Sequence, residues 1–193
     1  MDNLEDIQLK KMFLIVLIIS LSIAALIGII FFLIGSFNKY AIKVILTTLV
    51  LGGYSIIGMS SAELFEKRKW KILPLTGIVV YLFGLITAVL YLWEVGTGPF
   101  WKAPLIFLVI SVTIAQMSLL YLMESKKDYV NIGLASTSVF ASLVALALIA
   151  LIIEPNIAKK VGEFYFRLLG VFVILDGLGT IITPIMYQVS QSK

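Results

Sequence analysis

The stretch LLGVFVILDGLGTIITPIM, residues 168–186, decides the fold. It is apolar throughout except for one carboxyl group and two threonines, and a run of about 20 such residues is long enough to cross a bilayer as a helix. The carboxyl group, Asp176, is near its middle. An ionised carboxyl in hydrocarbon costs about 2.5–3.5 kcal/mol even on insertion scales, so Asp176 is a functional-site hypothesis by default.

The rest of the chain has the same character. It has 193 residues, of which 61% are hydrophobic and 13% charged, and its mean hydropathy is +1.08. The apolar residues are contiguous rather than amphipathic, which is typical of membrane spans. Six runs are predicted, at residues 12–35, 44–62, 72–93, 103–123, 130–153 and 164–186. Backbone groups cannot bond to water in hydrocarbon, so each span should be a helix. We expect residues 1–193 to form a single all-α transmembrane domain, a bundle of six helices with short loops.

Composition also limits the chemistry. The chain has no histidine and no cysteine, which excludes Cys/His zinc sites, iron–sulfur clusters, disulfides and Cys- or His-based catalysis. No Gly-rich phosphate cradle or HExxH pattern is present, and the loops are short. We therefore expect no enzyme, no cofactor and no metal site. The net charge of +4 is better explained by topology and lipid headgroups than by nucleic acid.

Basic residues in the connections predict the orientation of the spans. Nine lie on the side of the two termini and six on the other side, which favours cytoplasmic termini in a multi-pass cell-membrane protein. The connection EKRKWK, residues 66–71, contributes most to this prediction. The first span is too long for the apolar part of a cleaved signal peptide, so a retained signal-anchor helix is expected.

A faint internal repeat accompanies this pattern. Ser60, Ser118 and Asp176 are separated by 58 residues and then by 58 again. Spans two and three and spans four and five would then be parallel copies of one helical hairpin. Small transporters often arise from such repeats. Short loops and recurring basic connections give similar intervals without duplication, so both interpretations stay open.

The residues around Asp176 suggest a small polar pocket. Thr180 and Thr183 follow at i+4 and i+7, on the same helical face. Gly177 and Gly179 carry no side chain, and Pro184 cannot donate to the carbonyl of Thr180. Arg167 is nine residues away and out of phase with the carboxyl, so it cannot pair with Asp176 within the helix. Unless another helix brings a cation, Asp176 is expected to be largely protonated.

Two interpretations of this carboxyl remain open. In one, Asp176 binds and releases a proton or cation, with Thr180, Thr183, Gln116 and Ser118 as lining. In the other, a neutral Asp176 forms a hydrogen bond to a neighbouring helix and holds the bundle together, its candidate partners being Tyr54, Ser55, Ser60, Gln116 and Ser118. Gln116 is itself strongly polar and deep in a span, where interhelical bonding is commoner than a pore lining.

Two functions follow. The first is a structural or accessory membrane component without catalytic machinery, in contact with the lipid bilayer and with a protein partner or a second copy of the chain. The second is a small channel or ion- or proton-coupled transporter that uses Asp176.

Overall fold

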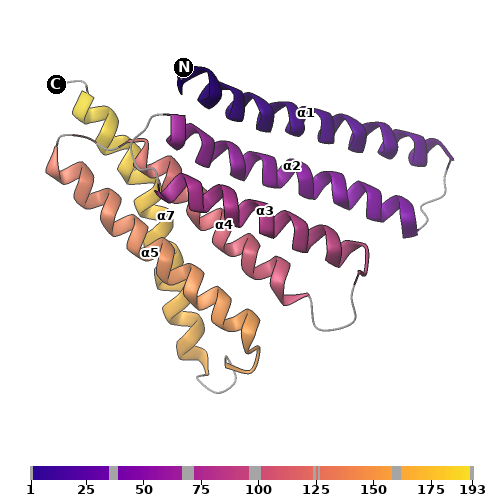
Figure 1. The fold of residues 1–193 in the computed structure, drawn as a ribbon. Helices are drawn as coiled ribbons and strands as arrows, with labels where there is room; N and C mark the ends of the chain where they lie inside the picture. The colour runs from indigo at the N-terminus through magenta and orange to yellow at the C-terminus, as the bar shows by residue number, and fades with distance from the viewer. Residues whose placement is uncertain are drawn as a thin grey trace. The chain divides into compact units, whose positions relative to one another are not determined.

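The computed structural model describes residues 2–34, 39–66, 72–95, 101–123, 125, 127–157 and 162–191. Within these ranges the regular structure is entirely α-helical (Figure 1). The helices are α1 (Asp2–Ile34), α2 (Lys39–Glu66), α3 (Ile72–Leu92), α4 (Lys102–Tyr121), α5 (Asp128–Ile153) and α7 (Glu163–Gln191). The predicted all-α fold is confirmed for the described residues, and each predicted span overlaps one of these helices. Residue 35 of the first predicted span lies outside the described residues, and a bundle of six membrane-crossing helices stays a prediction.

Five of the helices are long and apolar enough to cross a membrane. Their apolar stretches are Ile42–Leu64, Leu75–Leu92, Lys102–Tyr121, Asp128–Ile153 and Glu163–Gln191. In α1 the apolar stretch among the described residues is shorter, Leu14–Ile30. Large aliphatic side chains cover the outside of these helices: Leu26 is 61% exposed, Ile132 66% and Ile174 62%. A surface of this kind is solvated by hydrocarbon more readily than by water.

The chain divides into two compact units, Met1–Ser111 and Val112–Lys193, and the division falls within α4. In the first unit α1 packs along α2, and α2 packs against α3 (Figure 1). Its buried core is formed by Tyr54 and Ala62 of α2 with Tyr81 and Ala88 of α3. The two tyrosine rings meet edge to face, with their centroids 5.8 Å apart, a favourable aromatic geometry. A single domain over residues 1–193, and the 58-residue repeat, stay predictions.

Because Gly84 has no side chain, α2 and α3 can pack closely at this core. A Cβ atom at Gly84 would be 2.7 Å from the hydroxyl oxygen of Tyr54 and 2.8 Å from its Cε1. That hydroxyl is buried and has no hydrogen-bond partner among the described residues. Tyr54 therefore contributes its ring to the core, while its hydroxyl forms no bond there.

Tyr54→Phe is expected to be neutral or slightly stabilising, because it removes a buried polar group without breaking a bond. Gly84→Ala is expected to cost about 1–3 kcal/mol through overpacking against the ring. Thermal unfolding in detergent measures both, and Tyr54→Phe should recover part of the cost of Gly84→Ala. A Tyr54→Phe variant that unfolds well below the native protein would show that the hydroxyl has a partner after all.

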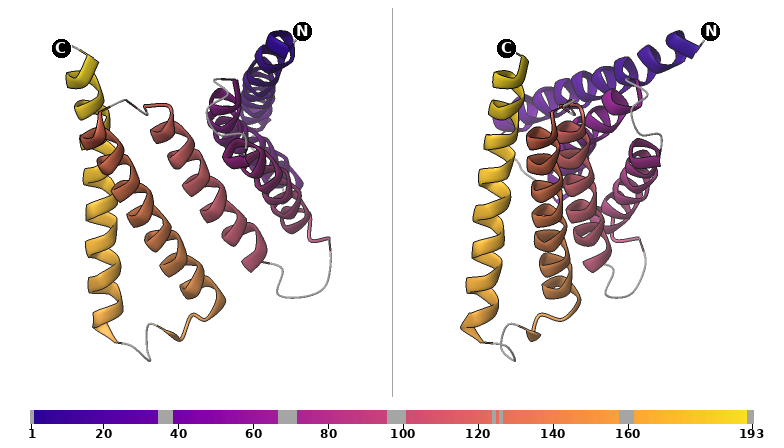
Figure 2. Two further views of the ribbon diagram at one scale, coloured as in Figure 1. Left: turned by 60° about the vertical axis from the view of Figure 1, so that its left-hand side comes forward. Right: turned by 90° about the vertical axis from the view of Figure 1, so that its left-hand side faces the viewer.

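In the second unit α5 and α7 lie side by side (Figure 2). Small residues and threonines form their contact. The Oγ1 atoms of Thr137 and Thr183 are 3.3 Å apart and both side chains are buried. A Cβ atom at Gly179 would lie 2.9 Å from Cγ2 of Thr137 and 3.0 Å from its Cβ. Near one end of the pair, the Tyr165 hydroxyl of α7 donates to the carbonyl of Ala147 in α5.

Serine and threonine hydroxyls mostly bond within their own helix. In α5, Thr137, Ser138 and Ser142 donate to the carbonyls four residues earlier, at 2.8, 2.9 and 2.8 Å. In α2, Ser55 and Ser60 donate to the carbonyls of Leu51 and Ile56. These hydroxyls need no partner on another helix to be satisfied, so their presence in a span is not evidence for a pore.

Candidate functional site

Three of the five predicted site residues meet in the second unit. The Gln116 amide nitrogen in α4 donates to the carboxyl Oδ1 of Asp176 and to the hydroxyl of Thr180 in α7, both at 2.8 Å. The Thr180 hydroxyl donates in turn to the backbone carbonyl of Asp176, also at 2.8 Å. One amide group thus joins two helices through both of its hydrogens. We call these three residues the amide–carboxyl cluster.

The local geometry of α7 places the two acceptors. Asp176 and Thr180 are four residues apart and therefore share one face of the helix. The helix continues through Pro184 to Gln191, so the described backbone is not interrupted beside the cluster. All three side chains are half-buried, and the carboxyl is therefore not sealed inside a dry core.

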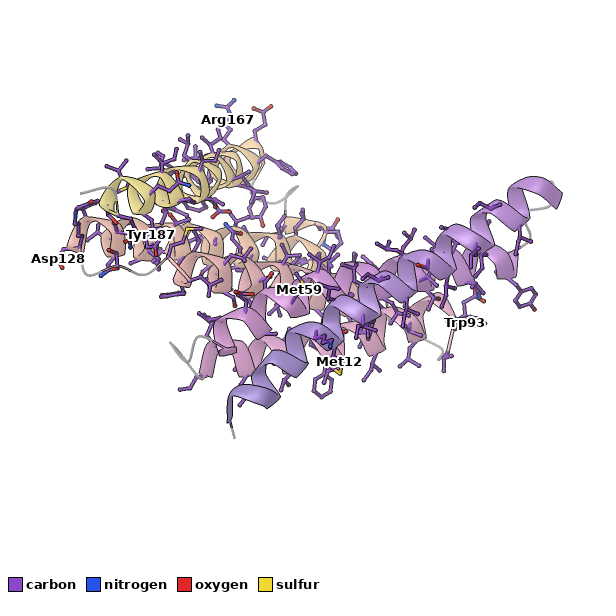
Figure 3. The ribbon with its side chains drawn as sticks, turned by 90° about the horizontal axis from the view of Figure 1, so that it is seen from above. Met12, Met59, Trp93, Asp128, Arg167 and Tyr187 are labelled. Carbon is purple, nitrogen blue, oxygen red and sulfur yellow. The ribbon has the colours of Figure 1, made fainter. Side chains whose placement is uncertain are left out.

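No cation balances this carboxyl in the part of the chain that the structure describes. Arg167 pairs instead with Glu163, one turn earlier in α7, at 2.8 Å, and it points away from the helices (Figure 3). Gln116 donates to Oδ1, and no described group donates to Oδ2. Asp176 can therefore act either as a hydrogen-bond acceptor for the amide or as a group that exchanges a proton at its second oxygen.

The two other predicted residues lie outside the cluster. Thr183 is buried against Thr137 of α5, and Ser118 is fully buried in α4, its hydroxyl unbonded within the described ranges. The two glycines near Asp176 differ in the space around them. A Cβ atom at Gly179 would contact the side chain of Thr137, whereas a Cβ atom at Gly177 would have no neighbouring atom within 4 Å. The described residues also contain no group of three acidic side chains that would hold a metal ion.

A second charged group, which the sequence did not single out, lies in the first unit. Glu94 follows the end of α3. Its Oε1 atom forms ion pairs with the ammonium groups of Lys39, at 3.0 Å, and Lys43, at 3.2 Å, both near the start of α2. Hydrogen bonds and charge attraction from Lys39 and then Lys43 lower the pKa of Glu94. The i,i+4 spacing of the two lysines was visible in the sequence, but their partner was not.

The Glu94 bridge predicts a pH effect. Because the pKa of Glu94 is lower in the folded protein than in the unfolded chain, its contribution to stability is present above the unfolded pKa and is lost as pH falls through the folded pKa. The native protein should therefore lose its stability advantage over Glu94→Gln at acidic pH. The melting temperatures of both proteins between neutral pH and about pH 3 test this. A difference that is constant across that range would mean that the two ion pairs contribute nothing measurable.

Comparison of this chain with models of protein families, with curated proteins and with solved structures gives no match. Its function is therefore inferred from its own residues.

Proposed function

We propose that this chain is a multi-pass integral membrane protein without catalytic machinery that acts as a structural or accessory component of its membrane. The observation that carries the proposal is the bond from the Gln116 amide to Asp176 and Thr180. A half-buried acid bonded to a neutral amide is an arrangement that joins membrane helices, because both groups would be costly in hydrocarbon when unpaired.

The surface of α7 supports a role in association. Apart from Thr183 and Ser190, its described side chains are half-buried or exposed, and the exposed ones include Phe164, Phe166, Ile174 and Ile181. This surface is open to lipid, to a protein partner or to a second copy of the chain. The nine basic residues on the side of the termini, against six on the other side, favour cytoplasmic ends. The basic residues 67–69, 71, 126, 159, 160 and 193, the connection 66–71 included, lie outside the residues whose side chains the structure describes.

Proton- or ion-coupled transport is the second candidate. The observation in its favour is the half-buried Asp176, whose Oδ2 receives no donor among the described residues. An intramembrane carboxyl of this kind is suited to take up and release a proton. Gln116 and Thr180 would then orient the carboxyl, while Thr183 and Ser118 stay predictions for the lining.

Reconstitution in liposomes distinguishes the two functions. Proton and monovalent-cation flux is measured for the native protein and for Asp176→Asn, which keeps the hydrogen-bonding shape but cannot ionise. For a structural component we expect no flux above protein-free liposomes in either case. Flux in the native protein that disappears in a folded Asp176→Asn variant would establish transport and overturn the structural proposal.

A further inference from the structure

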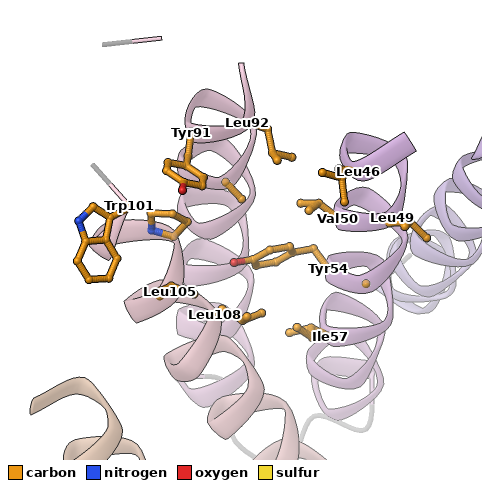
Figure 4. Close-up of a pocket in the computed structure, with 13 residues that line it drawn as sticks. Leu46, Leu49, Val50, Tyr54, Ile57, Tyr91, Leu92, Trp101, Leu105 and Leu108 are labelled. Carbon is orange, nitrogen blue, oxygen red and sulfur yellow. The ribbon is translucent and has the colours of Figure 1, made fainter. Parts of the chain in front are cut away.

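The first unit contains a partly open apolar groove. Residues of α2, α3 and the start of α4 form its walls, and its cavity has a volume of about 480 Å³, within the range of about 300–1,000 Å³ that is typical of small-ligand sites. The Tyr54 ring extends between the walls, with Val50 and Ile57 beside it and Leu105 and Leu108 opposite (Figure 4). The lining is almost entirely apolar.

One end of the groove is charged. A second hollow of about 330 Å³ shares Leu46, Tyr91 and Leu92 with the apolar groove, and its other lining residues include Lys39, Lys43 and Glu94. Both lysines bind the same carboxylate oxygen, at 3.0 and 3.2 Å. Two ammonium groups with one carboxylate leave one positive charge in excess, so this end complements a single negative charge.

Tryptophan residues near this charged end indicate its position relative to the membrane surface. Trp93 donates from its ring nitrogen to the Thr47 hydroxyl at 3.1 Å. Trp101 lines the apolar groove, and the Lys102 ammonium lies 5.6 Å from the centre of its ring. Tryptophan and lysine at helix ends are typical of the membrane–water interface. The charged end is then level with lipid headgroups, and the apolar groove is level with acyl chains.

We propose that this groove binds one anionic phospholipid, with an acyl chain along Val50, Tyr54 and Leu105 and the phosphate at Lys39 and Lys43. The chemical order of the site, charged at the interface and apolar below it, is that of a lipid molecule. The excess positive charge selects an anionic headgroup over a zwitterionic one. This inference rests on the membrane location proposed above but not on the role of Asp176.

Native mass spectrometry of the full chain in detergent tests the proposal, with phosphatidylglycerol and phosphatidylcholine of identical acyl chains added separately. We expect one tightly retained phosphatidylglycerol per chain and about fivefold weaker binding of phosphatidylcholine, the effect of one basic side chain at a lipid surface. Glu94→Gln should increase this preference, whereas a Lys39→Gln, Lys43→Gln double variant should abolish it.

A pair of glycine variants tests the groove itself. A Cβ atom at Gly53 of α2 would meet nothing within 4 Å, and Gly53 lines the groove. Gly53→Phe should therefore fill the groove without disturbing the helix packing and lower retention of phosphatidylglycerol at least tenfold. Gly28 of α1 is equally open but is not in the groove lining, so Gly28→Phe is the matched control and should bind as the native protein does.

Equal binding of the two lipids, a preference for phosphatidylcholine, or full retention by Gly53→Phe would overturn the proposal. Alkaline carbonate extraction separates this failure from failure of the membrane location. A chain that resists extraction but shows no lipid preference refutes only the lipid site. A chain that carbonate releases from membranes refutes the membrane location, and the lipid site with it.

Discussion

Gly179→Ala is expected to destabilise the contact between α5 and α7 by about 1–3 kcal/mol, the usual cost of overpacking. The new methyl group would lie 2.9 Å from Cγ2 and 3.0 Å from Cβ of Thr137. Thr137 cannot yield easily, because it is buried and its hydroxyl is bonded to the carbonyl of Gly133. The loss should appear as a lower midpoint in thermal or denaturant unfolding in detergent.

Gly177→Ala is the matched control for that variant. It lies two residues earlier in the same helix, and its new methyl group would meet nothing within 4 Å. Since alanine favours a helix over glycine by about 1 kcal/mol, this variant should be neutral or stabilising. A second change, Thr137→Ala, should recover stability in Gly179→Ala. Equal effects of the two glycine substitutions would mean that α5 and α7 do not meet at Gly179.

Gln116→Met is expected to lower stability by about 1–3 kcal/mol. The substitution keeps the length of the side chain but removes both donors, so the Oδ1 atom of Asp176 and the hydroxyl of Thr180 lose the amide that reaches them from α4. Single interhelical hydrogen bonds in membranes average about 0.6 kcal/mol, with a maximum of about 1.7. Two bonds from one amide account for the larger expected effect.

A double-mutant cycle isolates the interaction. The coupling between Gln116→Met and Asp176→Leu should account for much of the Gln116 effect, because both changes break the same bond. Gln188→Met, at an exposed position of α7, is the control for replacing an amide by a thioether. Additive effects of Gln116→Met and Asp176→Leu would show that the two side chains do not interact, and they would remove the main support for the structural proposal.

The sequence was sufficient to predict the helices because runs of about 20 apolar residues need no tertiary information to recognise. Only for α1 is the apolar stretch found among the described residues clearly shorter than the predicted span. It covers Leu14–Ile30, whereas the predicted span is residues 12–35. The helix itself, Asp2–Ile34, continues past this stretch into polar sequence at its amino-terminal end. Hydropathy therefore locates the helices well and their ends less well.

The amide–carboxyl cluster was only partly predictable. Asp176 stood out as a charge in an apolar run, and Thr180 followed from the i+4 rule. The sequence does not distinguish among five candidate partners for Asp176, because the pairing of residues 60 positions apart depends on which helices are neighbours. Thr183 follows the same helical periodicity as Thr180, yet its hydroxyl lies against Thr137 of α5. Thr180 instead bonds to Gln116 of α4, so nearby residues of α7 contact two different helices.

The groove of the first unit could not be predicted from the sequence. Its lining residues are ordinary apolar side chains from three helices, and hydropathy does not distinguish a wall from a packed contact. Its charged end joins Lys39 and Lys43 to Glu94, which lies some fifty positions later in the chain. In each case the missing information was the arrangement of helices, not the identity of the residues.

The difference between the hydroxyls and the Gln116 amide has a consequence for biosynthesis. Thr137, Ser138 and Ser142 bond to their own helix, so α5 satisfies these groups before it meets another helix. The amide of Gln116 has its acceptors 60 and 64 residues later in the chain. A nascent chain that stops before α7 thus carries a Gln116 amide without these two acceptors. The later helix α7 supplies both acceptors for the amide of α4.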